Sequence, residues 1–313
     1  AEDGIRDVAV TGVQTCALPI CRRLIRGETR DAWIFITPAL IDFLLFYILP
    51  AIRGIYFSFT DAGNLLKPEK LVGIKNYQKL IEDDVFWNAL WVTLEYVVIN
   101  IGIQTVIALL MAVLLDRLTR STWIRAIVVF PWLLPNVIAA MVFLWLLDYN
   151  LGIVNALLDG LGLPRQAFWG NELWAIPTIA LVNVWRHMGY TALLLFAGLQ
   201  TIPKDVYEAG AIDGASEVQL FRRVTLPLLR PVLALVMIVS IIGSFQIFDT
   251  VAVATNGGPV NATRVIYYYI VDQAFGRAHF GYGAAMAVVL MLILLAISIV
   301  QMRITRANQS DLA

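Results

Sequence analysis

Apolar stretches long enough to cross a lipid bilayer recur along this chain. A helix that spans the hydrocarbon core needs about 20 mostly apolar residues. Stretches of that kind lie at roughly 33–57, 87–115, 123–147, 173–198, 231–252 and 283–302. The pattern predicts an all-α polytopic membrane protein with about six transmembrane helices.

Prolines interrupt two of these stretches. Pro131 and Pro135 lie in the third stretch, and Pro177 lies in the fourth. Each proline removes a backbone donor and is an expected kink. Inside a membrane, the freed backbone groups must be satisfied by neighbouring helices or by cavity water. We therefore expect these kinks to serve either helix packing or a transport path.

Lysine and arginine are divided unevenly between alternate loops. Cytoplasmic loops of membrane proteins carry an excess of these residues. If the N-terminus lies inside, thirteen lysines and arginines fall on the cytoplasmic side and seven fall outside. This excess predicts that both termini are cytoplasmic. Four of the seven outer cations lie between the first two spans among acidic residues, which predicts a folded external loop.

The composition excludes several other classes of protein. Hydrophobic residues make up 59% of the 313 residues and charged residues 15%, whereas soluble domains have about 45–50% and about 25%. The net charge of zero gives no reason to expect nucleic acid as a partner. The sequence has no Walker-type phosphate loop, nucleophile elbow, zinc motif or Cys/His cluster. We therefore expect no catalytic residue, no metal site and no cofactor.

The first twenty residues differ from the rest of the chain. Residues 1–20 are mildly polar and lack helical periodicity, and they lack the basic start and long apolar run of a signal peptide. The string from Asp3 to Pro19 resembles a translated sequencing-adapter read-through. We expect this stretch to be either an artefact or a disordered tail, with the credible chain starting near Cys21.

The connection between the fourth and fifth spans, residues 200–231, has the start and stop signals of two short helices. Pro203 suits a first helical turn, and Gly214 suits a helix end that requires a positive φ. Ser216 can cap the following helix, and Pro231 opens the fifth span. Two helices joined at a glycine are expected to form a docking element rather than a simple linker.

This loop carries a motif of a known family. The motif is Tyr207-Glu208-Ala209-Gly210-Ala211-Ile212-Asp213-Gly214-Ala215-Ser216, followed by Phe221 and Leu226-Pro227. It resembles the EAA loop of binding-protein-dependent ABC importer permeases, which forms a coupling helix that inserts into a groove on the cytosolic ATPase. The resemblance assigns ATPase coupling to Glu208, Ala209, Gly210, Asp213, Gly214 and Pro227. Gly210 departs from the family's second alanine, which keeps close approach but weakens the helix by about 1 kcal/mol.

Two further segments resemble carbohydrate-importer permeases of the maltose and glycerol-3-phosphate type. One combines Thr255-Asn256-Gly257-Gly258-Pro259, Tyr267-Tyr268-Tyr269 and Gly281-Tyr282-Gly283-Ala284-Ala285, and the other combines Val72-Gly73-Ile74-Lys75-Asn76-Tyr77 with Phe86-Trp87. The resemblance covers about residues 31–305 and implies a type I ABC importer permease in a bacterial or archaeal cytoplasmic membrane. It implies as partners two cytosolic ATPase subunits, a second permease subunit, an extracytoplasmic solute-binding protein and the lipid membrane.

Polar residues inside the spans are candidates for the transport path, because a charge near the bilayer centre costs roughly 2.5–3.5 kcal/mol unless it has a partner or a cavity. On one face of the fourth span and one face of the fifth, the candidates are Asn183, Tyr190, Gln246 and Asp249. The alternative is pairing between helices, in which Arg186 neutralises Asp249. Pairing or snorkelling is favoured for Asp42, Arg53 and Glu95.

The sequence thus predicts the permease subunit of an ATP-driven, binding-protein-dependent sugar importer, which couples ATPase motion to alternating access. The expected divisions are the tail at 1–20, a basic cytoplasmic segment at 21–32, a six-span domain at 33–303 with a type I core at about 87–302, and a cytoplasmic tail at 304–313. A gradient-driven secondary transporter or channel is the alternative, although it would have no need for the 200–231 loop. An intramembrane enzyme is the second alternative, for which no converging catalytic set is visible. The solute classes open at this point are sugars, sugar alcohols and glycerol phosphates.

Overall fold

The structure, a computed structural model, describes residues 19–63, 69–118 and 121–305. It divides into two compact units, Ala1–Gly54 and Ile55–Ala313. The tail expected at 1–20 lies outside the described residues except for its last two positions. The tail expected at 304–313 lies outside them except for its first two.

The first unit is a long helix. α1 (Pro19–Phe43) continues through a π-helical turn, η1 (Leu44–Ile48), into α2 (Leu49–Phe57), whose last residues belong to the second unit. Residues Asp31–Phe57 reach a mean hydropathy of 2.1 and are long enough to cross a membrane. The helix contains the first predicted span.

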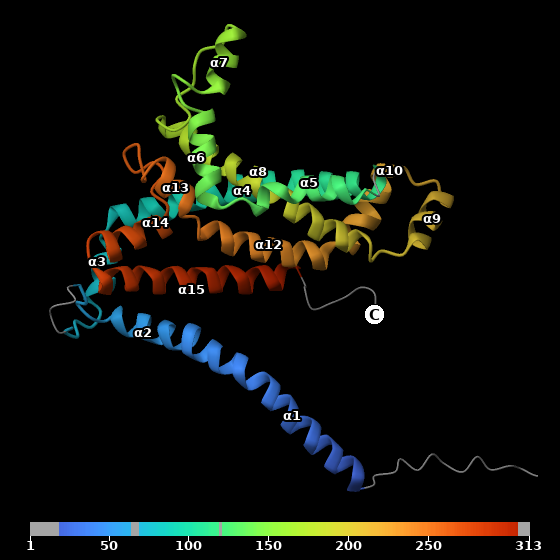
Figure 1. The fold of residues 1–313 in the computed structure, drawn as a ribbon, viewed down its shortest axis with the longest axis horizontal. Coiled ribbons are helices and arrows are strands. Elements are labelled where there is room, and N and C mark those ends of the chain that lie inside the picture. The colour runs from blue at the N-terminus through green and yellow to red at the C-terminus, as the bar shows by residue number, and fades with distance from the viewer. Residues whose placement is uncertain (1–18, 64–68, 119–120, 306–313) are drawn as a thin grey trace, which may run out of the picture. The chain divides into compact units, whose positions relative to one another are not determined.

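The second unit contains the other candidate spans (Figure 1). Three are unbroken helices: α4 (Asp84–Leu118), α8 (Glu172–Leu199) and α15 (Phe280–Thr305). One combines α12 (Arg230–Phe245) with α13 (Asp249–Ala254), and one is a bent pair, α5 (Thr122–Leu133) with α6 (Asn136–Leu146). The described residues thus hold five helices long and apolar enough to cross a membrane, or six if the bent pair is one span. This agrees with the six apolar stretches in the sequence.

α4 and α8 pack against each other through small side chains. Ala108 and Ala112 of α4 belong to one buried cluster with Ala192 of α8, and all three have no exposed surface. Small residues let two backbones approach closely in lipid, where helix association depends on packing. Gln104 Nε2 of α4 also donates to Thr191 Oγ1 of α8 at 2.8 Å. This buried hydrogen bond favours one register of the two helices.

The bend of 90° between α5 and α6 has a local cause. Pro135 has no N–H to donate to the carbonyl of Pro131, and its ring disfavours a helical conformation at Leu134. Leu134 and Pro135 accordingly take extended conformations, with ψ of 134° and 140°. The kink predicted in the third span is therefore located at Pro135. α8, in contrast, continues through Pro177 as one helix.

The segment before α4 is folded, as its mixed charges predict. Thr60 and Leu71 form an isolated antiparallel bridge. Asn76, in α3 (Lys75–Ile81), donates through Nδ2 to the carbonyls of Ser58 and Thr60 at 2.9 and 2.8 Å. These hydrogen bonds hold α3 against the residues that follow α2.

A carboxylate joins the ends at which α4 and α15 begin. Asp83 Oδ2 accepts hydrogen bonds from the hydroxyls of Tyr269 and Tyr282 at 2.7 and 2.5 Å, and Oδ1 accepts from the N–H groups of Val85 and Phe86. Burial raises the pKa of Asp83, but these four bonds outweigh it and hold its pKa below the ordinary value. Burial and the neighbouring Asp83 raise the pKa of Tyr269 to about 12. Tyr269 lies in α14 (Ile266–Val271), which leads through the π-helical turn η3 (Asp272–Gly276) to α15.

Candidate functional site

The loop between α8 and α12 begins with a helix that ends at a glycine. α9 (Lys204–Ile212) starts directly after Pro203, which occupies the N-cap, and carries Asp205 in its first turn. A carboxylate there interacts favourably with the helix dipole. Asp213 caps the helix, and Gly214 follows with a φ of +74°. The predicted stop at Gly214 is confirmed, while Pro203 lies one position before the predicted first turn.

The second helix of the loop starts at a capping box. Ser216 Oγ accepts from the N–H of Gln219, and Gln219 Oε1 accepts from the N–H of Ser216 at 2.7 Å. α10 (Glu217–Leu220) continues through the π-helical turn η2 (Phe221–Thr225) into α11 (Leu226–Leu228). Pro231 then lies in the first turn of α12. The cap at Ser216 and the start of the fifth span at Pro231 are therefore as predicted.

α9 lies against α10 and the ends of the spans. A Cβ at position 210 would lie 2.5 Å from Leu220 Cδ2, and Leu220 is buried. Gly210 therefore makes room for Leu220, which gives a packing reason for glycine at this position. The hydroxyls of Tyr207 and Thr225 are 3.1 Å apart, and Tyr207 packs on the buried cluster that joins α4, α8 and α12. Tyr207 thus ties α9 to the cluster that these three spans share.

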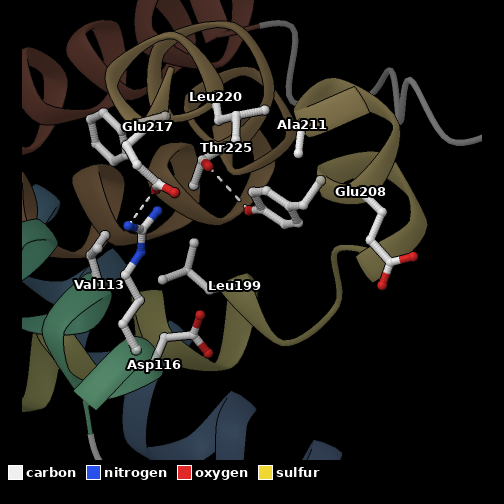
Figure 2. A pocket seen from close by; sticks show the side chains of 11 residues that line it. Val113, Asp116, Leu199, Glu208, Ala211, Glu217, Leu220 and Thr225 are labelled. Atoms are coloured by element: carbon white, nitrogen blue, oxygen red, sulfur yellow. Dashed lines mark hydrogen bonds and ion pairs between the residues drawn. The ribbon is translucent and has the colours of Figure 1, made fainter. Parts of the chain in front are cut away.

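A pocket of about 450 Å³ opens between this loop and the C-terminal end of α4 (Figure 2). Polar groups on its wall include Asp116, Arg117, Glu208 and Glu217. Arg117 Nη1 forms an ion pair of 2.5 Å with Glu217, and both side chains are substantially exposed. Exposed ion pairs contribute about 0–1 kcal/mol. The pair therefore orients α10 relative to α4 without contributing much to stability.

The outer face of α9 is open to solvent. Ile212 is 85% exposed, and Val218 of α10 is 62% exposed. The carboxylate of Glu208 points away from Glu217 (Figure 2). Of the six candidate coupling residues, four are exposed, Glu208, Ala209, Asp213 and Gly214, and two are partly buried, Gly210 and Pro227. An exposed apolar patch bordered by polar groups is typical of a surface that a protein partner covers.

The two candidate path residues of α8 are in contact with different helices. Asn183 Nδ2 donates to the hydroxyl of Tyr96 in α4. Tyr190 stacks on Trp132 of α5, with ring centroids 4.6 Å apart and planes 10° apart. Asn183 therefore lies at the interface with α4, whereas Tyr190 forms an aromatic pair beside the bend of α5 and α6.

The other two candidates flank the break between α12 and α13. Gln246 caps the end of α12 and is exposed. Asp249 begins α13 and accepts a hydrogen bond from Asn136 Nδ2 of α6 at 2.7 Å. The bend at Pro135 thus brings Asn136 to Asp249 and Trp132 to Tyr190.

Arg186 hydrogen-bonds to backbone carbonyls, while the carboxylate of Asp249 acts on it through its charge. Its Nε donates to the carbonyl of Leu134 at 2.8 Å, and one Nη donates to the carbonyl of Trp132 at 3.3 Å. Both carbonyls lie at the bend and lack helical partners. The freed backbone groups are therefore satisfied by a neighbouring helix, as membrane burial requires.

Arg186 also fixes the tautomer of His187. Another Nη of Arg186 lies 3.0 Å from His187 Nε2, and arginine can only donate, so Nε2 accepts. Nδ1 then carries the proton and donates to the carbonyl of Asn183 at 3.0 Å. His187 is thereby neutral, and each of its ring nitrogens takes part in a hydrogen bond. Across the described ranges, no three His, Cys, Asp or Glu side chains gather in a way that could hold a metal ion.

Two residues beside the bend, Trp132 and Asn136, were missed by the sequence analysis. The sequence pattern of α5 and α6 does not indicate that Trp132 contacts α8 or that Asn136 contacts α13. The available signal was their position next to Pro131 and Pro135, since polar and aromatic residues beside a broken helix commonly bond to the neighbours that satisfy the break.

Comparison with known proteins agrees with this architecture. Residues 104–309 match the family described as binding-protein-dependent transport system inner membrane component. The trehalose/maltose transport system permease protein MalF of Thermococcus litoralis is 32% identical over 280 residues, which cover 89% of this chain and 95% of that protein. The sulfoquinovosyl glycerol transport system permease protein SmoG of Agrobacterium fabrum is 32% identical over 284 residues, which cover 90% and 92%.

A solved structure has the same fold. It is a bacterial alginate ABC transporter in complex with an alginate pentasaccharide-bound periplasmic protein, with a TM-score of 0.79 at 22% identity, covering 92% of this chain and 99% of that one. These similarities do not favour a gradient-driven transporter or channel. The chain therefore belongs to the binding-protein-dependent transport system inner membrane component family and is a non-catalytic, membrane-spanning permease subunit of an ABC importer, whose ATPase is a separate subunit.

Proposed function

We propose that this chain carries a sugar and that α9 docks on a cytosolic ATPase. The observation that supports the docking is the exposed face of α9, with Glu208 and Ile212, on a helix that packs elsewhere on the buried cluster of the spans through Tyr207 and on α10 through Gly210. A force on the exposed face is therefore passed to this cluster, whose residues include members of α4, α8 and α12. Glu208, Ala209, Asp213 and Gly214 form the contact surface, while Gly210 and Pro227 maintain the shape of the loop.

This role determines the orientation. ATP is cytosolic, so α9 faces the cytoplasm, and six spans then leave both termini on the same side. The division of lysine and arginine supports the same orientation. Residues 21–32 then form a basic cytoplasmic segment, 33–303 form the six-span domain, and about 87–302 form its type I core. A second permease subunit and a solute-binding protein outside complete the importer.

A sugar is the proposed solute class. The relatives transport trehalose and maltose or sulfoquinovosyl glycerol by name, and the structural neighbour imports alginate. At the bend, an aromatic pair of Trp132 and Tyr190 lies on α5 and α8, and Asn183 adds an amide on α8. Gln246 and Asp249 add polar groups at the break between α12 and α13. Sugars bind through stacking on aromatic faces and through hydrogen bonds, so Asn183, Tyr190, Gln246 and Asp249 are the proposed path residues.

Copurification tests the docking proposal. The chain would be expressed with a candidate sugar-importer ATPase and captured, comparing wild type with Glu208→Arg and Gly214→Pro. Both variants are expected to lose the ATPase, because the first reverses an exposed charge and the second cannot adopt a φ of +74°. Glu82→Arg, at an exposed position near the start of α4, is the matched control and is expected to retain the ATPase.

Retention of the ATPase by Glu208→Arg would contradict the proposed contact, because that change leaves the packing of the loop intact. Transport kinetics test the path separately. Tyr190→Leu and Gln246→Leu are expected to raise the KM for sugar uptake at unchanged ATPase binding. Unchanged kinetics in both variants would refute the path assignment and leave the docking proposal standing.

A further inference from the structure

α7 (Ile153–Gly160) is amphipathic with the polarity reversed relative to a soluble protein. Ile153, Leu157 and Leu161 follow each other at intervals of four residues, and they are 55%, 64% and 76% exposed. Asn155, on the opposite face, is only 1% exposed. The helix therefore turns its apolar face outward and its polar face toward its own loop. In Figure 1, α7 projects from the far end of α6, away from the other helices of the second unit.

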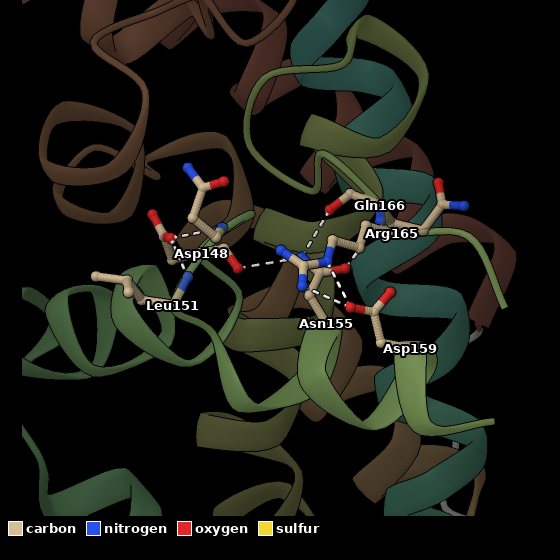
Figure 3. A network of polar contacts seen from close by, with 7 residues as sticks. Asp148, Leu151, Asn155, Asp159, Arg165 and Gln166 are labelled. Carbon is tan, nitrogen blue, oxygen red and sulfur yellow. Dashed lines mark hydrogen bonds and ion pairs between the residues drawn. The ribbon is translucent and has the colours of Figure 1, made fainter. Parts of the chain in front are cut away.

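A polar network fixes this arrangement (Figure 3). Asn155 Nδ2 donates to the carbonyls of Asp148 and Gln166 at 3.1 and 3.0 Å, and Asn155 Oδ1 accepts from the N–H of Gln166 at 2.8 Å. Arg165 pairs with Asp159 at 2.5 Å on the same side. The segments before and after α7 are thus tied together behind the helix. The apolar face is held outward by structure and is not a consequence of loose packing.

The surroundings of α7 exclude two environments. If α7 lay in water, the side chains of Leu151, Leu157 and Leu161 would stay in contact with solvent, because each is more than 60% exposed. The hydrocarbon core would enclose the irregular backbone of 147–152 and 161–171, which lipid does not tolerate. A boundary between the two accommodates both the leucines and the loops. We propose that α7 lies in the membrane–water interface at the end where α8 begins, with Ile153, Leu157 and Leu161 immersed among the lipid acyl chains.

Two features favour lipid over a protein as the occupant. α6, which leads toward α7 and passes the test for a candidate span together with α5, also carries exposed apolar side chains at Val137, Met141 and Trp145. Trp145 and Trp174, at the two ends of the projecting segment, are 64% and 46% exposed, as expected for aromatic residues at a membrane interface. The face itself is aliphatic and lacks the aromatic, arginine and hydrogen-bonding groups that protein interfaces carry.

Site-directed spin labelling tests this placement. Cys16 and Cys21 would be replaced by serine, and a nitroxide attached at Leu157→Cys or at Asp159→Cys as the matched control on the opposite side of α7. The full chain, assembled with its ATPase and second permease subunit in liposomes, would be exposed to oxygen, which concentrates in lipid, and to a water-soluble nickel chelate. Only variants that assemble with the ATPase and the second permease subunit as wild type does would be compared.

The label at position 157 is expected to collide with oxygen and to lose contact with the nickel chelate, with the reverse at position 159. Equal contact with the chelate at both positions would place α7 in water and overturn the proposal. Shielding of position 157 from both reagents would also overturn it, since this outcome indicates a protein contact. Shielding that appears only after a solute-binding protein is added would assign the face to that protein instead.

Discussion

Gly189 is a point of close approach between α8 and α5, so its replacement by alanine tests the packing of the two helices. A Cβ at position 189 would lie 1.8 Å from the carbonyl oxygen of Val128, whereas ordinary contact begins at 3.4 Å. α5 would have to retreat by about 1.6 Å, because the obstacle is backbone and cannot rotate away. Overpacking typically costs about 1–3 kcal/mol, and we expect about 3 kcal/mol here.

The same displacement has a second effect. Arg186, one turn before Gly189, donates to the carbonyls of Trp132 and Leu134 at the end of α5. A hydrogen bond that lengthens by more than about 0.5 Å beyond 3 Å is largely lost. Gly189→Ala is therefore expected to weaken the bend as well as the helix pair, and to lower transport together with stability.

The assay is thermal unfolding of the detergent-solubilised protein, followed by size-exclusion fluorescence. Gly102→Ala in α4 is the matched control, because no atom lies within 4 Å of its added Cβ. Alanine in an open helical position is expected to stabilise by about 1 kcal/mol. The two variants should thus shift the midpoint in opposite directions. A Gly189→Ala protein that unfolds at or above the wild-type midpoint would refute the close crossing of α5 and α8.

Three further predictions concern polar contacts. Asp83→Asn is expected to lower the unfolding midpoint at pH 7. Because folding lowers the pKa of Asp83, the difference from wild type should persist as the pH is lowered to 3.8, the ordinary pKa of aspartate, and should vanish only as the pH falls through the lower pKa of the folded state. Equal midpoints of variant and wild type already at pH 6 would contradict the network. Arg186→Met is expected to cost about 2 kcal/mol in the same assay by leaving carbonyls unbonded, and Arg186→Lys less, so equal losses would contradict the carbonyl contacts. Ser216→Ala is expected to remove about 1 kcal/mol of helix stability and to speed hydrogen exchange of the amides at 217–220 about fivefold, with unchanged exchange in α9 as the internal control.

The local features of the loop between α8 and α12 could be predicted from the sequence because each depends on adjacent residues. The stop at Gly214 requires only a residue that tolerates a positive φ, and the cap at Ser216 requires only the residue three positions later. The number of spans was predictable for a similar reason, since apolar length is a property of each segment alone. The docking role of Glu208 was inferred from the family motif and is a proposal.

The contacts at the bend could not be predicted, because they join residues far apart in the sequence. The pairing of Arg186 with Leu134 spans 52 residues, and that of Asn136 with Asp249 spans 113. Pro135 indicates that the helix breaks, but not the direction in which α6 continues. That direction determines which residues Arg186 and Asp249 meet, and for this reason the sequence left their mutual pairing open as an alternative to a place in the transport path.

The bend at Pro135 has a consequence for how this chain tolerates variation. The proline withdraws backbone bonds, and Arg186 on another helix supplies replacements. A substitution that straightened the helix would leave Arg186 without carbonyls and with a partly buried charge, while loss of Arg186 alone would leave the carbonyls unbonded. Each substitution alone is expected to lower the stability of the protein, and each is expected to lower it less when the other substitution is already present. The two positions are therefore expected to show epistasis, so that the double replacement is less harmful than the sum of the single replacements.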